Sequence, residues 1–414
     1  MRLRQRGTVK GKLLAAGVFV ALVAGAFGLS MLRGNGPDVS KTSDSASTAP
    51  SADVGEFRGI SLQLHSGHPD HPYETYIKEI ASVGANTVCL VVPGYQENAS
   101  STSIFIDSRK APRDQRLVEL MDHAHRLGLR VVLMPILLLE NPGSGEWRGK
   151  LEPTDWGDWW EDYNAFMLHY ADVARRGQAD AFIIGSELVS TERQEQRWRD
   201  LIVRVRSRYD GLLSYSANWD HYRPVKWWDA VDMIGVTTYF DLTNGDEPTL
   251  ERLMQSWSEI KNELLQWRRT QGKPLLFTEV GWPNQATAAQ YPWDYFRAQD
   301  EPAPEIQADC FEAFFRTWFD EPDVAGFLVW EWRSYPAQRV GPEDPSYVPV
   351  GKPALEVIEK YYQRPVTGEL PTTGPAQPPE ATEPTISEPE DHDNADASVS
   401  LPLLPVDEDS ELLP

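Results

Sequence analysis

Cysteine is scarce in this chain, which has only two among 414 residues. So few cysteines exclude a small fold held together by several disulfides, and they exclude a zinc module that takes most of its ligands from cysteine. Neither Cys89 nor Cys310 has a His beside it in the sequence that would suggest a nucleophile. We expect both to be buried, unpaired and equivalent to small apolar residues.

Positive charge is also in short supply. The 39 Lys and Arg stand against 62 Asp and Glu, which makes a formal net charge of −23. A surface that binds nucleic-acid phosphates is basic, so nucleic acid is excluded as the main partner. Hydrophobic residues make up 41% of the chain and aromatic residues 11%, which is enough for a sizeable core. The length allows one large domain with tails, or two to three smaller domains.

The charge is unevenly distributed along the chain. Residues 1–53 carry a net charge of +4, residues 54–364 carry −15, and residues 365–414 carry −12 without a single Lys or Arg. The last segment also holds ten Pro and almost no aromatic residues. It cannot bury enough apolar surface to offset the entropy of the chain, so we predict an acidic, Pro-rich disordered tail over 365–414.

The N-terminal region contains the longest uncharged run, Leu13–Leu32, which is long enough to cross a bilayer as a helix. Basic residues precede it and favour a cytoplasmic N-terminus. We predict that residues 1–32 are a signal anchor of a single-pass cell-membrane protein whose remainder is extracytoplasmic. A cleaved signal peptide with a small-residue site at 24–26, and therefore a secreted protein, is the alternative. Residues 33–54, rich in Ser, Thr, Pro and Gly, are predicted to be a flexible linker.

Eight short apolar runs alternate with amphipathic stretches between Phe57 and Tyr362. Most runs are continuous, which is typical of parallel strands buried on both faces, and several helical stretches end in Gly, which favours C-terminal capping. Eight βα units over residues 55–364 predict an α/β fold of the (β/α)8 TIM barrel class. A doubly wound open sheet is disfavoured because no Gly-rich phosphate loop follows the first run. The runs are 59–64, 87–92, 130–139, 181–188, 212–219, 232–240, 274–282 and 325–332.

The residues that close these runs are the candidate site residues, because the active site of such a barrel lies at the C-terminal ends of its strands. Two runs close on acids, Glu187 and Glu279. A carboxylate in this position costs free energy unless solvent or a partner stabilises it. Aromatic side chains close other runs, namely Trp219, Tyr239, Trp282, Trp330 and Trp332.

Paired carboxylates among flat aromatic faces suit a pyranose ring, whose apolar face stacks on indole while the acids act on the glycosidic bond. Retaining glycosidases use two carboxyls about 5–5.5 Å apart, which the fourth and seventh strands of a barrel can supply. We therefore predict a carbohydrate substrate, without a cofactor or a metal. His65, His68 and His71 lack a helical zinc motif, and His65 is the best candidate among them for a sugar contact.

Residues 57–363 resemble glycoside hydrolase family 113, a family of retaining (β/α)8 glycosidases known for endo-β-mannanase activity. The resemblance extends over long segments in the same order. These are EWRGKLEPTDWGDWWEDYNAFMLHYADVA, IIGSELVSTERQEQRWRDLIVRVR, LSYSANWD, DMIGVTTYFDLT, GKPLLFTEVGW and YVPVGKPALEVIEKYY.

The resemblance implies that Glu187 is the catalytic acid/base, that Glu279 is the nucleophile and that Tyr239 orients the nucleophile. It also implies that Asn218, Trp219 and Trp330 line the sugar sites, to which the pattern of strand ends adds Trp282 and His65. Two features depart from the family. Ser186, which we include among the substrate-binding residues, stands where the family commonly has Thr, and the third run, LMPILLLEN, lacks the Lys and His that usually contribute to substrate binding.

These observations predict a retaining glycoside hydrolase that acts on a β-linked poly- or oligosaccharide of the β-mannan type. The main alternative is a non-catalytic, membrane-anchored carbohydrate-binding barrel involved in envelope or exopolysaccharide handling. A third hypothesis makes the acidic tail the working part and the barrel its scaffold. The negative charge of the barrel disfavours strongly acidic glycans.

Strand alternation predicts that Glu331 points away from the face shared by Trp330 and Trp332 and is a structural acid.

Overall fold

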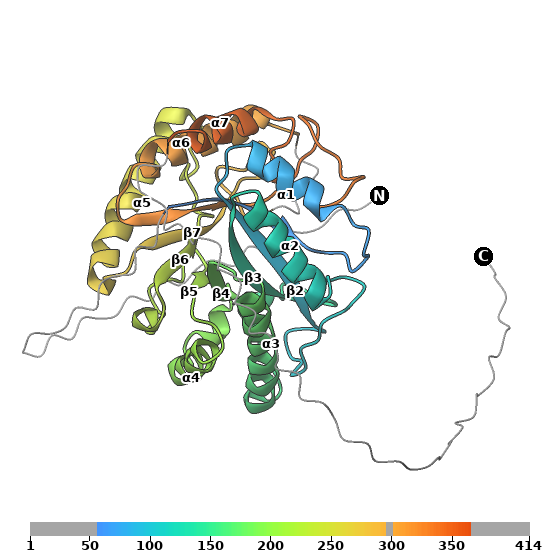
Figure 1. Ribbon diagram of the computed structural model, residues 1–414. Coiled ribbons are helices and arrows are strands. Elements are labelled where there is room, and N and C mark those ends of the chain that lie inside the picture. The colour runs from blue at the N-terminus through green and yellow to red at the C-terminus, as the bar shows by residue number, and fades with distance from the viewer. Residues whose placement is uncertain (1–55, 295–300, 366–414) are drawn as a thin grey trace, which may run out of the picture. The chain divides into compact units, whose positions relative to one another are not determined.

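The computed structural model describes residues 56–294 and 301–365. Within them, eight parallel strands form a closed barrel in the order of the sequence, and β8 pairs with β1. Helices surround the strands on the outside (Figure 1). The predicted TIM barrel is confirmed and the open-sheet alternative is wrong. The strands are β1 (Phe57–Gln63), β2 (Thr87–Gln96), β3 (Arg130–Leu139), β4 (Ala181–Ser186), β5 (Leu212–Ala217), β6 (Met233–Thr237), β7 (Leu275–Val280) and β8 (Val324–Val329).

The described residues contain seven α-helices, one after every strand except β5. The link from β5 to β6 contains Pro224 and forms only a short 3-10 helix, η3 (Trp228–Ala230). Two further 3-10 helices, η1 (Arg148–Lys150) and η2 (Val189–Thr191), lie in the links after β3 and β4. The α-helices are α1 (Tyr73–Ser82), α2 (Asp114–Arg126), α3 (Trp156–Arg176), α4 (Glu195–Arg206), α5 (Leu250–Gln271), α6 (Pro304–Trp318) and α7 (Pro353–Tyr362).

Local sequence signals explain several helix ends. The Asp155 carboxylate caps α3 by accepting the backbone N–H groups of Gly157 and Asp158 at 2.6 and 3.1 Å. Helix α5 ends at Gly272, whose φ of 69° lies in the left-handed region that a side chain disfavours. The predicted Gly cap is confirmed there.

The buried side chains form two layers. A smaller cluster, which includes Val91, Met134 and Leu276, fills the barrel. A larger cluster, which includes Trp159 and Phe314, packs between the strands and the helices. Cys89 belongs to the inner layer and Cys310 to the outer one. Both cysteines are free and buried, as predicted.

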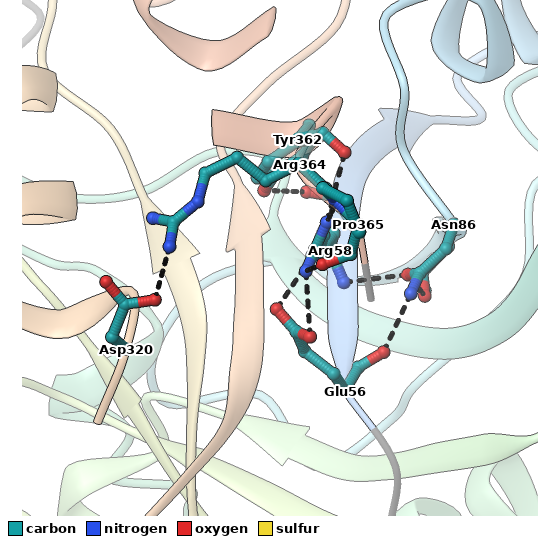
Figure 2. Close-up of polar contacts among 9 residues, drawn as sticks. Glu56, Arg58, Asn86, Asp320, Tyr362, Arg364 and Pro365 are labelled. Carbon is teal, nitrogen blue, oxygen red and sulfur yellow. Dashed lines mark hydrogen bonds and ion pairs between the residues drawn. The ribbon is translucent and has the colours of Figure 1, made fainter. Parts of the chain in front are cut away.

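At the N-terminal end of the barrel, Arg58 of β1 ties the first strand to the end of the last helix (Figure 2). Its buried guanidinium donates to the carbonyl oxygens of Tyr362 and Pro365, each at 3.2 Å, and pairs with Glu56 at 2.7 Å. These bonds fasten α7 across the seam between β8 and β1. They lie at the opposite end of the barrel from the strand ends where the candidate site is predicted.

The predicted anchor (1–32), linker (33–54) and acidic tail (365–414, except Pro365) lie outside the described residues and stay predictions. Within residues 56–294 and 301–365, none of the helices combines the length and the apolar character needed to cross a membrane.

Strand β7 contains an irregularity that decides where its acid points. Leu276 lies in the inner layer and Phe277 in the outer one, so simple alternation would place Val280 inside. Val280 instead lies in the outer layer, because the register with β8 shifts between Phe277 and Val280. The shift moves Glu279 to the inner face at the C-terminal end of the barrel. Bulges of this kind often redirect side chains beside active sites.

Candidate active site

Two carboxylates from opposite parts of the barrel meet at its C-terminal end. Glu187 directly follows β4 and Glu279 lies near the end of β7. One nitrogen of Arg148, Nη2, lies 2.7 Å from Glu187 Oε2 and 3.9 Å from Glu279 Oε1. The two carboxylate oxygens can therefore be no further apart than the sum of these two distances. The predicted pairing of the two acids is present in the structure.

Glu279 is buried and accepts two hydroxyl hydrogen bonds. Tyr239 donates to Oε2 at 2.8 Å and Ser186 donates to Oε1 at 3.1 Å. Burial and the nearby Glu187 raise the pKa of Glu279 to about 7, against the lowering effects of Arg148 and the two hydroxyls. Tyr239 thus contacts the acid that the resemblance assigns to it, whereas Ser186, which was predicted to bind substrate, also hydrogen-bonds Glu279.

Glu187 has a different set of partners. Arg148 donates to Oε2, and the hydroxyl of Thr237, the last residue of β6, donates to Oε1 at 3.2 Å. Its backbone has φ of 53°, a left-handed conformation that is uncommon for a residue with a side chain. Glu187 is therefore held by one side chain from the link after β3 and one from the end of β6.

Arg148 and Thr237 were not among the residues predicted from the sequence. Arg148 opens η1 in the loop after β3, far from any strand end, and only its place in the quoted EWRGK segment could have drawn attention to it. It places a positive charge beside both carboxylates. Thr237 is an ordinary strand residue, and only the folded barrel reveals its contact with Glu187.

An aromatic pair is linked to Glu187 through the hydroxyl of Thr237. The backbone N–H of Trp219 donates to Thr237 Oγ1 at 3.0 Å, and that hydroxyl in turn binds Glu187. The indole of Trp219 stacks on that of Trp293, with centroids 5.6 Å apart and planes 16° apart. Trp293 is exposed and was not predicted. Asn218 precedes Trp219 and is half-buried, with its amide donating to Asp220 at 2.7 Å.

On the other side of the barrel, Trp330 and His65 lie near the junction of β8 and β1. Trp330 is half-buried and packs against the inner layer. The ring of His65 lies parallel to that of the exposed Tyr335, and its Nε2 donates to the Gln63 amide oxygen. The Gln63 amide nitrogen donates to Glu331. His65 and Trp330 are thus placed at this end of the barrel, as predicted.

The predicted orientation of Glu331 relative to Trp330 and Trp332 is wrong. Strand β8 ends at Val329, so alternation does not extend through the next three residues. Trp332 lies in the outer layer and donates its indole N–H to Glu79 at 3.0 Å, whereas Trp330 packs on the inner layer. Glu331 faces Gln63, and burial raises its pKa to about 7. It is a half-buried acid near the junction of β8 and β1.

Trp282 is also placed differently from the prediction. Its side chain is fully buried in the outer layer, with its ring 5.1 Å from that of Phe311 and 6.3 Å from that of Trp257. The strand β7 ends at Val280, and the chain beyond it turns toward helices α5 and α6. Trp282 is therefore a core residue and cannot stack on a sugar.

The chain matches the sequence model of Glycoside Hydrolase Family 113 over residues 69–352. No curated protein matches the chain. The match spans the barrel from the link after β1 to the start of α7, and it includes both carboxylates, Tyr239 and Arg148.

Solved structures agree with the family match. The GH113 β-mannanase AaManA from Alicyclobacillus acidocaldarius, in complex with ManMIm, is 31% identical, with 75% of this chain and 98% of that chain covered and a TM-score of 0.67. A GH113 β-1,4-mannanase is 26% identical, with 75% and 100% covered and a TM-score of 0.68. Ruminococcus gnavus β-glucuronidase, at 11% identity and a TM-score of 0.50 over 74% of this chain and 50% of that chain, shares the fold alone.

Proposed function

The chain belongs to glycoside hydrolase family 113 and is a glycoside hydrolase, and from that premise we propose that it cleaves a β-mannan-type glycan with retention of configuration. The observation that carries the mechanism is the short gap between Glu187 and Glu279. Arg148 Nη2 lies 2.7 Å from a Glu187 oxygen and 3.9 Å from a Glu279 oxygen, so these two oxygens are no further apart than the sum of the two distances. This upper limit allows the ~5–5.5 Å separation of retaining enzymes and reaches only the lower end of the range for inverting enzymes.

In the first step, a Glu279 oxygen attacks the anomeric carbon and the bond from that carbon to the leaving oxygen breaks. Glu187 transfers its proton to the leaving oxygen, and a glycosyl ester forms on Glu279. Hydrogen bonds from Tyr239 and Ser186 stabilise the negative charge of the attacking carboxylate.

In the second step, Glu187 accepts a proton from a water molecule, which attacks the same anomeric carbon. The ester bond to Glu279 breaks, the sugar leaves with its original configuration and both carboxyls return to their starting states. Arg148 is within reach of both carboxylates, so it compensates the single negative charge on whichever of them carries it.

Replacement of Arg148 by Met is expected to move the acidic limb of the pH profile of kcat/KM upward by about one pH unit. The arginine lowers the pKa of Glu279, so its loss raises the pH at which the nucleophile ionises. Activity at pH 6 then falls about tenfold more than activity at pH 8. The matched control, Arg148→Lys, keeps the charge and the position of the limb. An unshifted limb in the Met variant would refute the electrostatic role.

The Trp219–Trp293 stack is the proposed platform for the sugar on the leaving-group side, because Trp219 is linked to Glu187 through Thr237. We expect Trp293→Ala to lower kcat/KM for a long β-1,4-mannooligosaccharide about tenfold, equivalent to about 1.4 kcal/mol. An aryl β-mannoside, which has no sugar on that side, should be unaffected. Trp293→Phe keeps a flat ring, so its kcat/KM for the oligosaccharide should lie between those of the wild type and Trp293→Ala. Equal losses on both substrates would exclude the platform.

The test of the proposed function is a screen of the purified protein against β-mannan, galactomannan, cellulose, xylan and polyuronides. Products are measured by chromatography, and the anomer formed first is identified by proton NMR. We expect mannan cleavage with the β-anomer released first. Release of the α-anomer would refute retention. Binding of a polysaccharide without turnover would favour the carbohydrate-binding alternative.

A further inference from the structure

The backbone at Glu187 adopts a conformation that its own sequence does not favour. Its φ of 53° is in the left-handed region, which is unfavourable for a residue with a side chain. Such a conformation persists only where the surroundings enforce it, and it is concentrated at functional sites. The carboxylate of Glu187 is aimed by this turn, so the groups that enforce the turn also determine the position of the carboxylate.

Two hydrogen bonds enforce the turn. The N–H of Glu187 donates to the Ser216 carbonyl at 2.8 Å, in continuation of the pairing between β4 and β5. The next N–H, that of Leu188, has left the strand and donates to the phenol oxygen of Tyr215 at 2.9 Å. Both partners are buried, so water does not replace a lost bond, and an unsatisfied buried N–H is costly. The Tyr215 phenol therefore holds the first peptide beyond Glu187.

The phenol is itself fixed by a buried acid. Tyr215 donates to Glu192 Oε1 at 2.7 Å, and His221 Nδ1 donates to Glu192 Oε2 at 2.6 Å. Burial raises the pKa of the Tyr215 phenol well above its usual value, so the phenol keeps its proton and donates in one direction only. Glu192 has no exposed side-chain surface, and its two partners come from β5 and from the loop after β5.

These contacts form one continuous chain from His221 through Glu192 and Tyr215 to the peptide of Leu188. Neither Tyr215 nor Glu192 is hydrogen-bonded to Glu279, whose partners Tyr239 and Ser186 come from other positions. The hydrogen-bonded chain from His221 to Leu188 therefore acts on Glu187 and not on Glu279.

We propose that the buried Tyr215–Glu192–His221 chain is a positioning device for Glu187, which holds the left-handed turn so that the acid/base reaches the glycosidic oxygen. This inference rests on the proposed function, because it concerns the proton-transfer half of that reaction. Tyr215, Glu192 and His221 are positioning residues, since they act through Glu187.

The experiment compares two substrates whose leaving groups differ in their need for a proton. A β-1,4-mannotetraose requires protonation of the leaving oxygen, whereas 2,4-dinitrophenyl β-mannobioside does not. We expect Tyr215→Phe to lower kcat/KM about 30-fold for mannotetraose, within the range of a displaced acid, and less than about twofold for the aryl substrate. Azide, which attacks the glycosyl ester without a base, should restore kcat on the aryl substrate.

The matched control is Tyr163→Phe. Tyr163 is fully buried, and its phenol donates to the Ile184 carbonyl of the same strand β4 at 2.9 Å, but it does not reach Leu188. We expect Tyr163→Phe to lower the melting temperature and to change kcat/KM by a similar factor for both substrates. Glu192→Gln retains an acceptor for the phenol, and its kcat/KM values should be close to those of the wild type. Glu192→Ala should show the same difference between the two substrates as Tyr215→Phe, and combining Glu192→Ala with Tyr215→Phe should cause no further loss.

Equal losses on both substrates in Tyr215→Phe, or wild-type values on both, would overturn the positioning role while leaving the proposed function intact. A wild-type protein that cleaves neither substrate would overturn the proposed function and the positioning role together. A Tyr163→Phe variant with the same substrate split would also overturn the positioning role, because it would assign the effect to the strand in general.

Discussion

Glu279→Gln is expected to lower kcat for mannan and for aryl β-mannosides by roughly 10⁴-fold or more, since the variant lacks the atom that forms the glycosyl ester. The amide has nearly the shape of the carboxylate and fits beside Tyr239 and Ser186. Loss of activity should therefore occur without loss of substrate binding. Steady-state kinetics and calorimetric binding of mannotetraose measure the two effects separately.

Stability provides the control for this variant. Burial and Glu187 raise the pKa of Glu279 from 4.5 to about 7, so the folded protein binds more protons than the unfolded chain between these values. The contribution of Glu279 to stability therefore falls as the pH rises from 4.5 through 7. Glu279→Gln removes this loss and should melt at a higher temperature than the wild type at pH 8, with a smaller difference at pH 5. A variant that is inactive because it unfolds would melt lower at both pH values.

Glu187→Gln is expected to show the second largest effect, and the effect should depend on the leaving group. Without the acid, kcat/KM for mannan should fall about 10²- to 10⁴-fold, the usual contribution of general acid catalysis. For a dinitrophenyl mannoside, whose leaving group needs no proton, kcat/KM should change little. The second step still lacks its base, so the glycosyl ester accumulates and kcat falls.

Azide gives the decisive measurement for Glu187→Gln. It should raise kcat on the aryl substrate and yield a β-mannosyl azide, which mass spectrometry and NMR identify. An α-linked azide would indicate a single displacement and refute the double-displacement mechanism. Wild-type activity of Glu187→Gln on mannan would remove Glu187 from the mechanism. The same azide experiment on Glu279→Gln should yield no β-azide, because no ester forms there.

Part of the site could be predicted because strand ends are visible in the sequence. Glu187 and Glu279 each close an apolar run, and in a parallel barrel all such ends lie on one face. Their meeting therefore follows from the order of the elements. Tyr239 could be placed on the same face for the same reason, and the hydrogen bond to Glu279 confirms this placement.

The errors have a common physical origin. Trp282 was placed by extending its strand to residue 282, and Trp332 by extending strand alternation, in both cases beyond the last paired residue. Once the ladder ends, each side chain takes the orientation that its loop gives it, so Trp282 and Trp332 entered the outer layer while Glu331 turned toward Gln63. Trp293 was missed because it lies in a loop and only stacking on Trp219 marks it.

The sequence by itself determined the closed barrel and the face on which the chemistry lies. Continuous apolar runs of strand length, separated by amphipathic helices, are typical of parallel strands covered on both faces, and eight such units without a Gly-rich phosphate loop favour the closed barrel over an open sheet. The tertiary structure alone decided how the two acids are aimed. A shift of register in β7 turns Glu279 inward, and a left-handed turn held by Tyr215 directs Glu187. Both depend on contacts between neighbouring strands, which periodicity along one strand does not encode.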